Sequence, residues 1–527
     1  MDGNEGLIQI LAAPHESVNS NVLAEEMVAL WGKTAAEKQG ISSVSAGVGA
    51  ENTLIGCLNF SFYDPRREVT RLKQAGRGGI GTVLRQKKVK ALVVKYVGLA
   101  GDSNHPEDLE GIQKTGAKMH REIYQQDAIM YQMRLDGTNH LTKIMNDYDI
   151  LPVHNFRYGA HPQAHHIYSE HFQKYFDYSS PDGCWYGCTL ACAKVATGLE
   201  LHTGPLKGQS VTVDGPEYET IAGCGSLLGI FDPHTVVELN FYCDAYGLDT
   251  ISVGTATAFA MECFELGLIT SAHTGGLELY FGNRAAALEI VHQMARGEGF
   301  GRIVGQGVRR MKSIFAKEFG SDPTIMADIG MESKGLEFSE YVTKESLAQQ
   351  GGYGLALKGP QHDEAWLIFL DMVHNLMPTF EKKAEALHWF PMFRTWFSLC
   401  GLCKLPWNDI VPEDNQSSAE PAKVMKHVQW YAEYFSSVTG RESSPDDLIR
   451  MSEAVYNFQR IFNLRMGLGR REHDTLPYRA VGPVTELEYE SRAERYDKQL
   501  TDTHRVDIAG KETAEKVALL RMFRERQ

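Results

Sequence analysis

The segment Asp244-Ala-Tyr-Gly-Leu-Asp249 is followed by Thr250-Ile-Ser-Val-Gly254 and by a stretch with one apolar face, Thr255–Leu268. The glycine of the hexamer predicts a tight turn, because glycine adopts backbone conformations that other residues avoid. The apolar spacing after the turn indicates a helix. Polar groups beside such a turn could bond a polar heterocycle, although an ordinary helix stop at Gly247 also explains the pattern.

A second hexamer of the same layout, Ser398-x-x-Gly401-Leu402-Cys403, occurs about 150 residues later. Taken alone, each hexamer fits the end of a helix. Two of them in one chain indicate two equivalent halves of one ligand site.

Nine cysteines occur in the chain, three of them spaced as Cys184-x3-Cys188-x3-Cys192 and two as Cys400-x-x-Cys403. In a long chain this clustering favours metal or redox chemistry over disulfides. On a helix, a four-residue spacing would place the first three thiolates on nearly one face. A fourth thiolate from Cys400 or Cys403 would complete an iron–sulfur site. A structural zinc site and three unliganded core cysteines are the alternatives.

A glycine-rich turn, Gln74-Ala-Gly-Arg-Gly-Gly-Ile-Gly81, precedes the expected strand at Ala91–Lys95. Bare backbone N–H groups at Gly78 and Gly79, with the Arg77 guanidinium, would suit a phosphate. Most turns of this kind have no ligand, so the motif alone is weak evidence.

Two further groups could move protons. Glu219 follows Gly215-Pro-Glu-Tyr and adjoins the apolar stretch Ile221–Ile230, where low polarity could raise a carboxyl pKa and allow acid or base catalysis. His362 lies in a polar segment and is a candidate proton carrier. A solvated surface position or a satisfied core bond is the alternative for each.

Composition limits the class of protein. The 527 residues carry 53 basic and 67 acidic side chains, a net charge of −14 that disfavours nucleic-acid binding. Hydrophobic residues make up 43% and charged residues 23%, which is typical of globular proteins. Apolar runs are much shorter than the roughly 20 residues that cross a bilayer, so no membrane span is expected. The first residues show no export signal, so a cytoplasmic location is expected.

The chain divides into a β-containing part and two mainly helical parts, with predicted boundaries at 1–105, 106–332 and 333–527. Short strands are expected at Leu7–Leu11, Ile41–Ala46, Leu54–Phe62 and Ala91–Val97, with one helix around Ser20–Gln39. Further helices are expected within 106–150 and at Thr255–Leu268, Asn283–Arg296, Arg302–Phe319, Asp363–Asn375, Pro421–Ser437 and Pro445–Met466.

Several motifs follow one another in a family-specific order: Ala75-Gly-Arg-Gly-Gly-Ile-Gly81, Gly215-Pro-Glu-Tyr-Glu-Thr220, Gly247-Leu-Asp-Thr-Ile-Ser252, Gly401-Leu-Cys403 and Phe462-Asn-Leu-Arg465. This ordered set covers nearly the whole chain and resembles the tungsten-containing aldehyde:ferredoxin oxidoreductases, a family that includes the tungsten subunits of class II benzoyl-CoA reductases. The resemblance implies an α+β fold in which a β-rich, cofactor-base domain underlies two mainly helical domains.

The resemblance also implies cofactors: a tungsten (or molybdenum) bis-pyranopterin, Mg²⁺ bridging the pterin phosphates, and a [4Fe-4S] cluster. Glu219 would lie beside the metal, and His362 would transfer protons. The cluster ligands would be Cys184, Cys188, Cys192 and Cys403. The pterin contacts would be Arg77, Gly78, Gly79, Asp244, Gly247, Leu248, Asp249, Ser398, Gly401 and Leu402.

The implied reaction is oxidation of an aldehyde to a carboxylic acid, with electrons passing through the cluster to ferredoxin or an iron–sulfur subunit. One alternative is a low-potential reductase of aromatic acyl substrates, as in class II benzoyl-CoA reductases. Another is a non-catalytic iron–sulfur or zinc-binding subunit.

The sequence departs from the family pattern at several points. The first cysteine gap is three residues rather than two, Ser398 replaces an aspartate, and Glu364 replaces a basic residue. Phe241 stands where a Glu-x-x-His pattern starting at Glu238 would have its histidine, so the family's dimer-bridging iron is not expected. The sequence also begins partway through the family's first domain, so we expect either a separate subunit that supplies the rest or a truncated or diverged form.

Overall fold

A four-stranded antiparallel sheet forms the first part of the fold, in a computed structural model that describes residues 1, 6–13, 19–96, 105–124, 128–179, 181–184, 188–405 and 425–525. The strand order is β3–β2–β1–β4. Buried serines face each other inside this sheet, with 2.8 Å between the hydroxyls of Ser43 and Ser61, so their polar groups are satisfied. The strands are β1 (Ile41–Ser45), β2 (Leu58–Asp64), β3 (Val69–Ala75) and β4 (Ala91–Lys95).

The helix expected around Ser20–Gln39 is two helices, α1 (Ser20–Trp31) and α2 (Ala35–Gln39). Helix α1 ends before Gly32. Thr34 and Glu37 then form a capping box at the start of α2, in which each side chain accepts from the backbone N–H of the other residue. The strand expected at Leu7–Leu11 does not form, whereas β3 was not predicted, because its charged residues hide the alternating pattern. The other short helices of this part are α3 (Val48–Asn52) and α4 (Ile80–Gln86).

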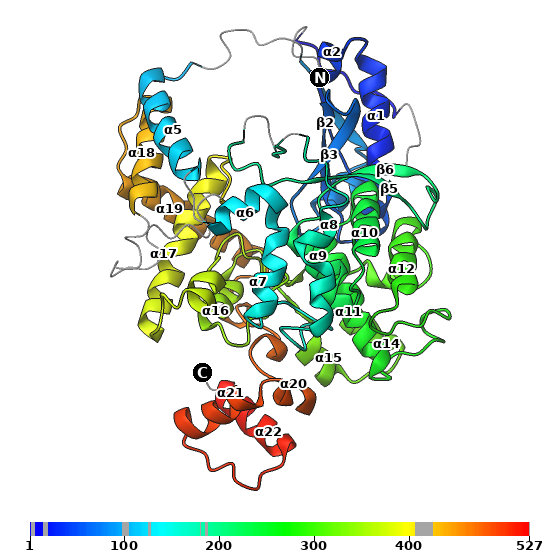
Figure 1. Ribbon diagram of the computed structural model, residues 1–527, viewed down its shortest axis with the longest axis vertical. Coiled ribbons are helices and arrows are strands. Elements are labelled where there is room, and N and C mark those ends of the chain that lie inside the picture. The colour runs from blue at the N-terminus through cyan, green and yellow to red at the C-terminus, as the bar shows by residue number, and fades with distance from the viewer. Residues whose placement is uncertain are drawn as a thin grey trace.

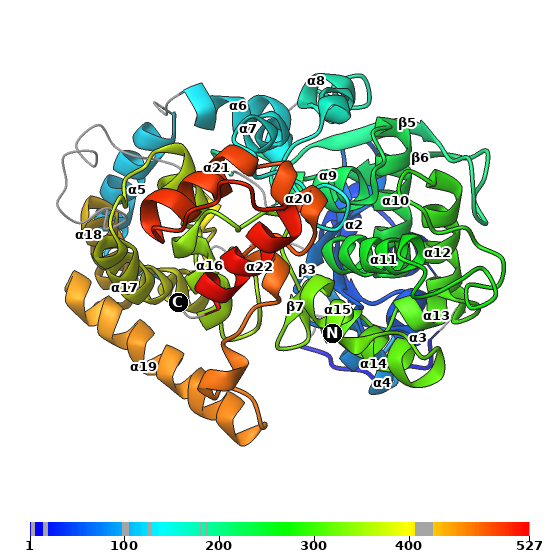
Figure 2. The same ribbon diagram turned by 90° about the horizontal axis from the view of Figure 1, so that it is seen from below.

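The remaining elements are mainly helical and form two groups that lie side by side (Figures 1 and 2). One group lies against the sheet and contains α9 (Tyr218–Cys224), α10 (Pro233–Tyr246), α11 (Thr250–Glu265), α12 (Arg284–Arg296), α13 (Gly301–Val304), α14 (Val308–Glu318) and α15 (Pro323–Ile329). The other contains α5 (Leu109–Tyr124), α16 (Leu347–Leu355), α17 (Phe380–Leu399), α18 (Met425–Thr439) and α19 (Pro445–Arg465). The α+β prediction is therefore confirmed.

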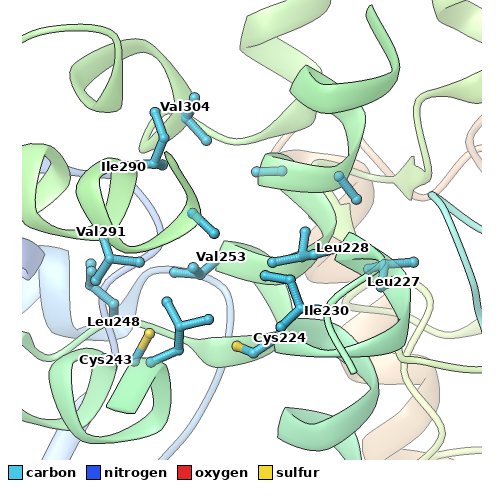
Figure 3. Close-up of a cluster of buried hydrophobic side chains, with 14 of the residues drawn as sticks. Cys224, Leu227, Leu228, Ile230, Cys243, Leu248, Val253, Ile290, Val291 and Val304 are labelled. Atoms are coloured by element: carbon cyan, nitrogen blue, oxygen red, sulfur yellow. The ribbon is translucent and has the colours of Figure 1, made fainter. Parts of the chain in front are cut away.

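The core of the first group is closely packed around α10 and α11 (Figure 3). A Cβ atom at Gly254 would lie 2.5 Å from the carbonyl oxygen of Gly223, so only glycine lets α11 approach α9 this closely. Buried leucine, isoleucine, valine and cysteine side chains fill the space between the helices, and 14 of the residues are drawn in Figure 3. This packing fixes the turn between α10 and α11, which contains the first hexamer.

Helices distant in the sequence meet in the second group. Helix α5 packs against α18, and the Thr115 hydroxyl donates a hydrogen bond of 3.0 Å to Glu433 (Figure 1). Among the predicted helices, Pro445–Met466 is confirmed as α19, which begins at a Ser444 capping box. The helix expected at Asp363–Asn375 is only a short π-helix, Phe369–Val373, and α17 was not predicted.

The connecting elements are short. They are α6 (Ala128–Asp136), α7 (Leu141–Asp147), α8 (Ser169–Phe172), β5 (Val195–Glu200), β6 (Ser210–Asp214), β7 (Glu332–Ser333) and β8 (Leu336–Glu337). The predicted helices Asn283–Arg296 and Thr255–Leu268 correspond to α12 and α11, and that of Arg302–Phe319 is divided into α13 and α14 between Gly305 and Gly307. Residues 421–424 of the expected helix Pro421–Ser437 lie outside the described ranges. No described helix combines the length and apolar character that a bilayer crossing requires.

The C-terminal helices α20 (Glu486–Glu490), α21 (Ala493–Lys498) and α22 (Thr513–Arg524) form a small layer with its own core of tyrosine and leucine side chains. Arg479, fully buried, joins this layer to α11 by pairing with Glu262 and with Glu488 at 2.7 Å. Lys344 also pairs with Glu488 at 2.8 Å, and burial lowers the pKa of Lys344 to about 8. The anchor of this layer is thus a buried network of charges.

We predict that Arg479→Met lowers the free energy of unfolding by about 3–5 kcal/mol, because Glu262 and Glu488 lose a buried partner. Arg470→Met is the control, since Arg470 is exposed and lies 3.8 Å from Glu472, and its loss should cost less than about 1 kcal/mol. Denaturant unfolding measures both variants. Equal stabilities of the two variants would contradict the anchoring role.

Candidate functional site

The cysteine motif lies on an irregular loop between Asp182 and Lys194 rather than on a helix. The backbone of Asp182 forms isolated β-bridges with Cys192 and Ala193. Ala191 adopts a left-handed backbone conformation, with φ of +50°. The helical arrangement considered for the three cysteines is therefore wrong. Residues 185–187 within this loop lie outside the described ranges.

Cys403, from the end of α17, lies beside the loop. Burial raises the pKa of Cys192, and the neighbouring charges of Glu217, Cys403, Cys188 and Cys184 raise it further. Burial also raises the pKa of Cys403, as do Cys184 and Cys188. Cys403 is thus near enough to the cysteines of the loop for their pKa values to be coupled, despite a separation of more than 200 residues from Cys192 in sequence.

Cys400 differs from Cys403 in its surroundings. Burial is the cause of the raised pKa of Cys400, with no contribution from the other thiols. The backbone N–H of Leu405 donates to the Cys403 sulfur at 3.4 Å. Leu405, Cys188 and Cys192 all pack against the buried side chains of Met133 and Leu190. An N–H donor to a cysteine sulfur is a common feature of iron–sulfur sites. The donor set therefore fits a four-thiolate cluster that uses Cys403.

Buried ion pairs hold this loop to the hairpin of β2 and β3. Asp182 accepts from Arg67 at 2.9 Å and from Arg71 at 2.8 Å. Arg71 also reaches Asp214 at 2.9 Å, and Lys73 pairs with the same carboxylate. The position of Cys184 and Cys192 thus depends on charges supplied by the sheet.

The first hexamer is buried at the junction of α10 and α11. Gly247 ends α10 with φ of +72°, and a Cβ atom there would lie 2.5 Å from the backbone nitrogen of Gly47. The N–H of Cys57 donates to Gly247 at 2.9 Å, and the N–H of Asp249 donates to Ile55 at 3.0 Å. Residues 47–57 thus cover the hexamer.

Two acids and Leu248 of this hexamer have distinct roles in the fold. Asp249 caps α11 through the Ile251 N–H, and Leu248 is buried in the core. Burial raises the pKa of Asp244 well above its ordinary value, and Asn240 donates to Asp244 at 3.1 Å. A cavity of about 350 Å³ between β3, β6 and α10 borders Asp244.

Arg77 points into the protein from the turn between β3 and α4. Its Nε donates to Asp249 at 2.8 Å and its Nη2 to the Glu337 carbonyl at 3.0 Å. Its Nη1 is buried without a protein partner. Gly78 and Gly79 have φ of +79° and +80°, and a Cβ atom at Gly78 would meet open space. The buried, unused donor fits a bound polar group between Arg77 and the first hexamer.

The second hexamer has a different environment. Ser398, Gly401 and Leu402 are exposed, and the side chain of Leu402 is 38% accessible. Gly401 has φ of +65° after the end of α17, in agreement with the predicted turn. The first hexamer is covered by residues 47–57, whereas the second lies open in the part of the chain that the structure describes.

Glu219 and His362 form a pair. The His362 Nδ1 lies 2.9 Å from Glu219 Oε1 and 3.2 Å from the Ser339 hydroxyl. Glu219 Oε2 accepts from the backbone N–H of Glu340 at 2.9 Å. The carboxylate lies in the first turn of α9, where the helix dipole favours negative charge. Glu219 is therefore held by a hydrogen bond at Oε2, whereas its buried Oε1 has no hydrogen-bond donor and faces His362.

Two short connections link the Glu219–His362 pair to the cysteine site. Glu217, two residues before Glu219, is half-buried and contributes to the raised pKa of Cys192. Arg394 donates to the carbonyls of Asp363 and Lys404, at 2.8 and 3.3 Å. The loop with His362 is thereby tied to the loop with Cys403.

Sequence reasoning missed the segment of residues 337–340. Glu337 and Glu340 are fully buried, and burial raises the pKa of each. Ser339 and Glu340 contact the Glu219–His362 pair directly. The available signal was a pair of acids beside apolar residues, the same argument that selected Glu219.

The profile of the family "Aldehyde ferredoxin oxidoreductase, domains 2 & 3" matches residues 114–507. The chain belongs to this family, and the resemblance inferred from the motifs is confirmed. It is 26% identical over 474 residues to the tungsten-containing aldehyde ferredoxin oxidoreductase of Pyrococcus horikoshii, covering 88% of this chain and 71% of that protein. It is 28% identical over 297 residues to a Pyrococcus furiosus aliphatic sulfonate oxidoreductase, WOR-like subunit, covering 55% of this chain and 44% of that protein.

Among solved structures, the active site complex BamBC of benzoyl coenzyme A reductase with 1,5-dienoyl-CoA has a similar fold. The TM-score is 0.60 at 17% identity, covering 88% of this chain and 73% of that chain. The similarity supports the fold assignment.

We predict that Cys403→Ser lowers the bound iron of anaerobically purified protein, because one of four neighbouring thiolates is lost. Cys400→Ser is the matched control and should retain wild-type iron, since Cys400 stands apart from the other sulfurs. Iron analysis and visible absorbance measure both. Iron loss in Cys400→Ser alone would reverse the ligand assignment.

Proposed function

We propose that this chain is the tungsten–pterin subunit of a cytoplasmic oxidoreductase that converts an aldehyde into a carboxylic acid. The observation that carries the proposal is the Glu219–His362 pair, at 2.9 Å. The charge of Glu219 raises the pKa of Arg77, which pairs with Asp249, and Glu217, two residues before Glu219, raises the pKa of Cys192. Membership of the family and the tungsten-containing relatives in Pyrococcus support a tungsten cofactor, with molybdenum as the alternative.

The residues present fit these groups. Cys184, Cys188, Cys192 and Cys403 would hold a [4Fe-4S] cluster. The buried first hexamer and the unpartnered Nη1 of Arg77 would hold one pterin with its phosphates, and Mg²⁺ would supply positive charge to those phosphates. When bound, the metal–pterin group supplies two-electron redox chemistry and the cluster supplies single-electron transfer.

The protein's part in the reaction is proton handling. Oxidation of an aldehyde consumes one water and releases two protons and two electrons as the carboxylic acid forms. Glu219 accepts a proton from that water, because its Oε2 is fixed by the Glu340 N–H while Oε1 faces His362. His362 then carries the proton at Nδ1, and the Ser339 hydroxyl keeps the ring in place. The electrons pass to ferredoxin or an iron–sulfur subunit.

A separate subunit is proposed to cover the second hexamer. Leu399 and Leu402 are 48% and 38% exposed, beside Ser398 and Gly401, although the equivalent first hexamer is buried. A pterin bound there would need a second wall, as residues 47–57 provide for the first. The partner could also carry the electron-accepting cluster.

A low-potential reductase of aromatic acyl substrates is the second candidate function. Glu364 favours it, because a half-buried acid stands near His362 where the family has a basic residue, and loss of solvent contact raises the pKa of Glu364. The Glu364 carboxylate accepts a hydrogen bond of 3.0 Å from the Leu357 N–H, so the backbone of this loop fixes its position.

We predict that Glu219→Gln reduces aldehyde-oxidising turnover by about 100-fold or more with tungsten and iron retained, because the proton acceptor is removed. Glu298→Gln, at an exposed position far from this pair, is the control and should retain activity. Turnover is measured with a viologen dye. Full activity of Glu219→Gln with intact metal content would remove Glu219 from the mechanism.

A substrate comparison separates the two functions. We expect viologen-linked oxidation of short aliphatic or aromatic aldehydes and no reduction of aromatic acyl-CoA by the protein purified with its partner subunit. Elemental analysis of the same sample should find iron with tungsten or molybdenum. The reverse substrate preference would support the reductase, iron alone an electron-transfer module, and zinc alone a structural site.

A further inference from the structure

A second group of metal-binding side chains lies outside the site described above. His202, His234 and Glu238 each offer one ligand atom, and these atoms all lie within 4.8 Å of one another. Glu238 is buried, His234 is half-buried and His202 is exposed. None of the three takes part in the proposed reaction.

Two of these residues share a face of α10. His234 and Glu238 are four residues apart, and the His234 Nδ1 lies 3.7 Å from Glu238 Oε2. The other ring nitrogen, Nε2, lies 2.9 Å from the carbonyl oxygen of Glu200. A carbonyl oxygen can only accept, so Nε2 carries the proton and the Nδ1 lone pair faces Glu238. Metal-binding histidines are commonly held by such a bond.

Glu238 is fixed by its other oxygen. Oε1 accepts from the backbone N–H groups of His202 and Thr203, at 3.0 and 2.7 Å, and from the Thr203 hydroxyl at 2.7 Å. These bonds also hold the loop after β5 against α10, which places His202 beside His234. Oε2 remains directed toward the histidines.

The two imidazoles are stacked, with 4.0 Å between ring centroids and 14° between their planes. A metal lies near the plane of each imidazole that it binds, so these parallel rings cannot share one ion without a change. His202 is exposed and free to turn about its side-chain bonds. The ligand atoms would close from 4.8 Å to about 3.4 Å, the separation that bonds of about 2.0–2.1 Å give in a tetrahedral zinc site.

We propose that His202, His234 and Glu238 bind one divalent transition-metal ion within a single chain. Two histidines and one carboxylate with an open, solvent-facing position are a common ligand set for Zn²⁺ and Fe²⁺. The site does not use the Glu-x-x-His pattern of the family, because Phe241 occupies the third position after Glu238.

The ion would clamp the loop after β5 to α10. Both elements lead to the proposed active site, since the β5–β6 hairpin continues to Glu219 and the last turn of α10 contains Asp244. The role is therefore structural, and its test does not depend on the reaction.

The test is a calorimetric titration with Zn²⁺ of anaerobically purified holoprotein that has been treated with EDTA. Wild type should bind one more equivalent per chain than His202→Gln/His234→Gln. His171→Gln, an exposed histidine outside the group, should match wild type. The single variant His202→Gln replaces only an exposed side chain, so it should fold normally even if the double variant does not. We expect it to weaken zinc binding at least tenfold.

Two readouts decide the outcome. X-ray absorption of the bound zinc should show nitrogen and oxygen neighbours at about 2.0–2.1 Å without sulfur, and zinc should raise the Tm of wild type by about 2 °C or more but not that of the double variant. Equal zinc stoichiometry and affinity in wild type and the double variant, or sulfur ligation of the added ion, would overturn the site.

Discussion

The site depends most on the ion pairs that the buried carboxylate of Asp182 forms with two arginines. Arg67 and Arg71 hold it from the hairpin of β2 and β3, and its backbone pairs with Cys192. A buried charge that lost these partners would cost several kcal/mol, so the loop and the sheet are fixed together. An irregular loop can therefore keep three cysteines near Cys403 without a helix to align them.

The two hexamers share a sequence layout but not an environment. The first hexamer is enclosed because Gly47 and Gly247 approach without side chains and residues 55–57 bond to its backbone. The second hexamer follows a long helix and is exposed in the described chain. This difference makes the two hexamers unequal in how they are built.

Sequence reasoning was accurate where a local signal decides the structure. Helices α12 and α19 were predicted to within a residue or two, because Asn283 and Ser444 cap them and the apolar spacing is regular. Sequence reasoning failed where contacts with residues distant in the sequence decide the local structure. Strand β3 carries charges that are buried only because Asp182 and Asp214 meet them, and the helix over Ser20–Gln39 is divided at Gly32. Packing against other elements overrides local pattern in such segments.

The sequence by itself determined the residue types of the site, the family and the fold class, because the motifs fall in one order and each glycine turn needs its own backbone conformation. Only the tertiary structure decided that His362 pairs with Glu219. It also brought Ser339 and Glu340 to that pair. The physical reason is that the contacts of Glu219 with His362 and Glu340 join residues more than 100 positions apart, and their geometry follows from burial and ion pairing across the whole fold.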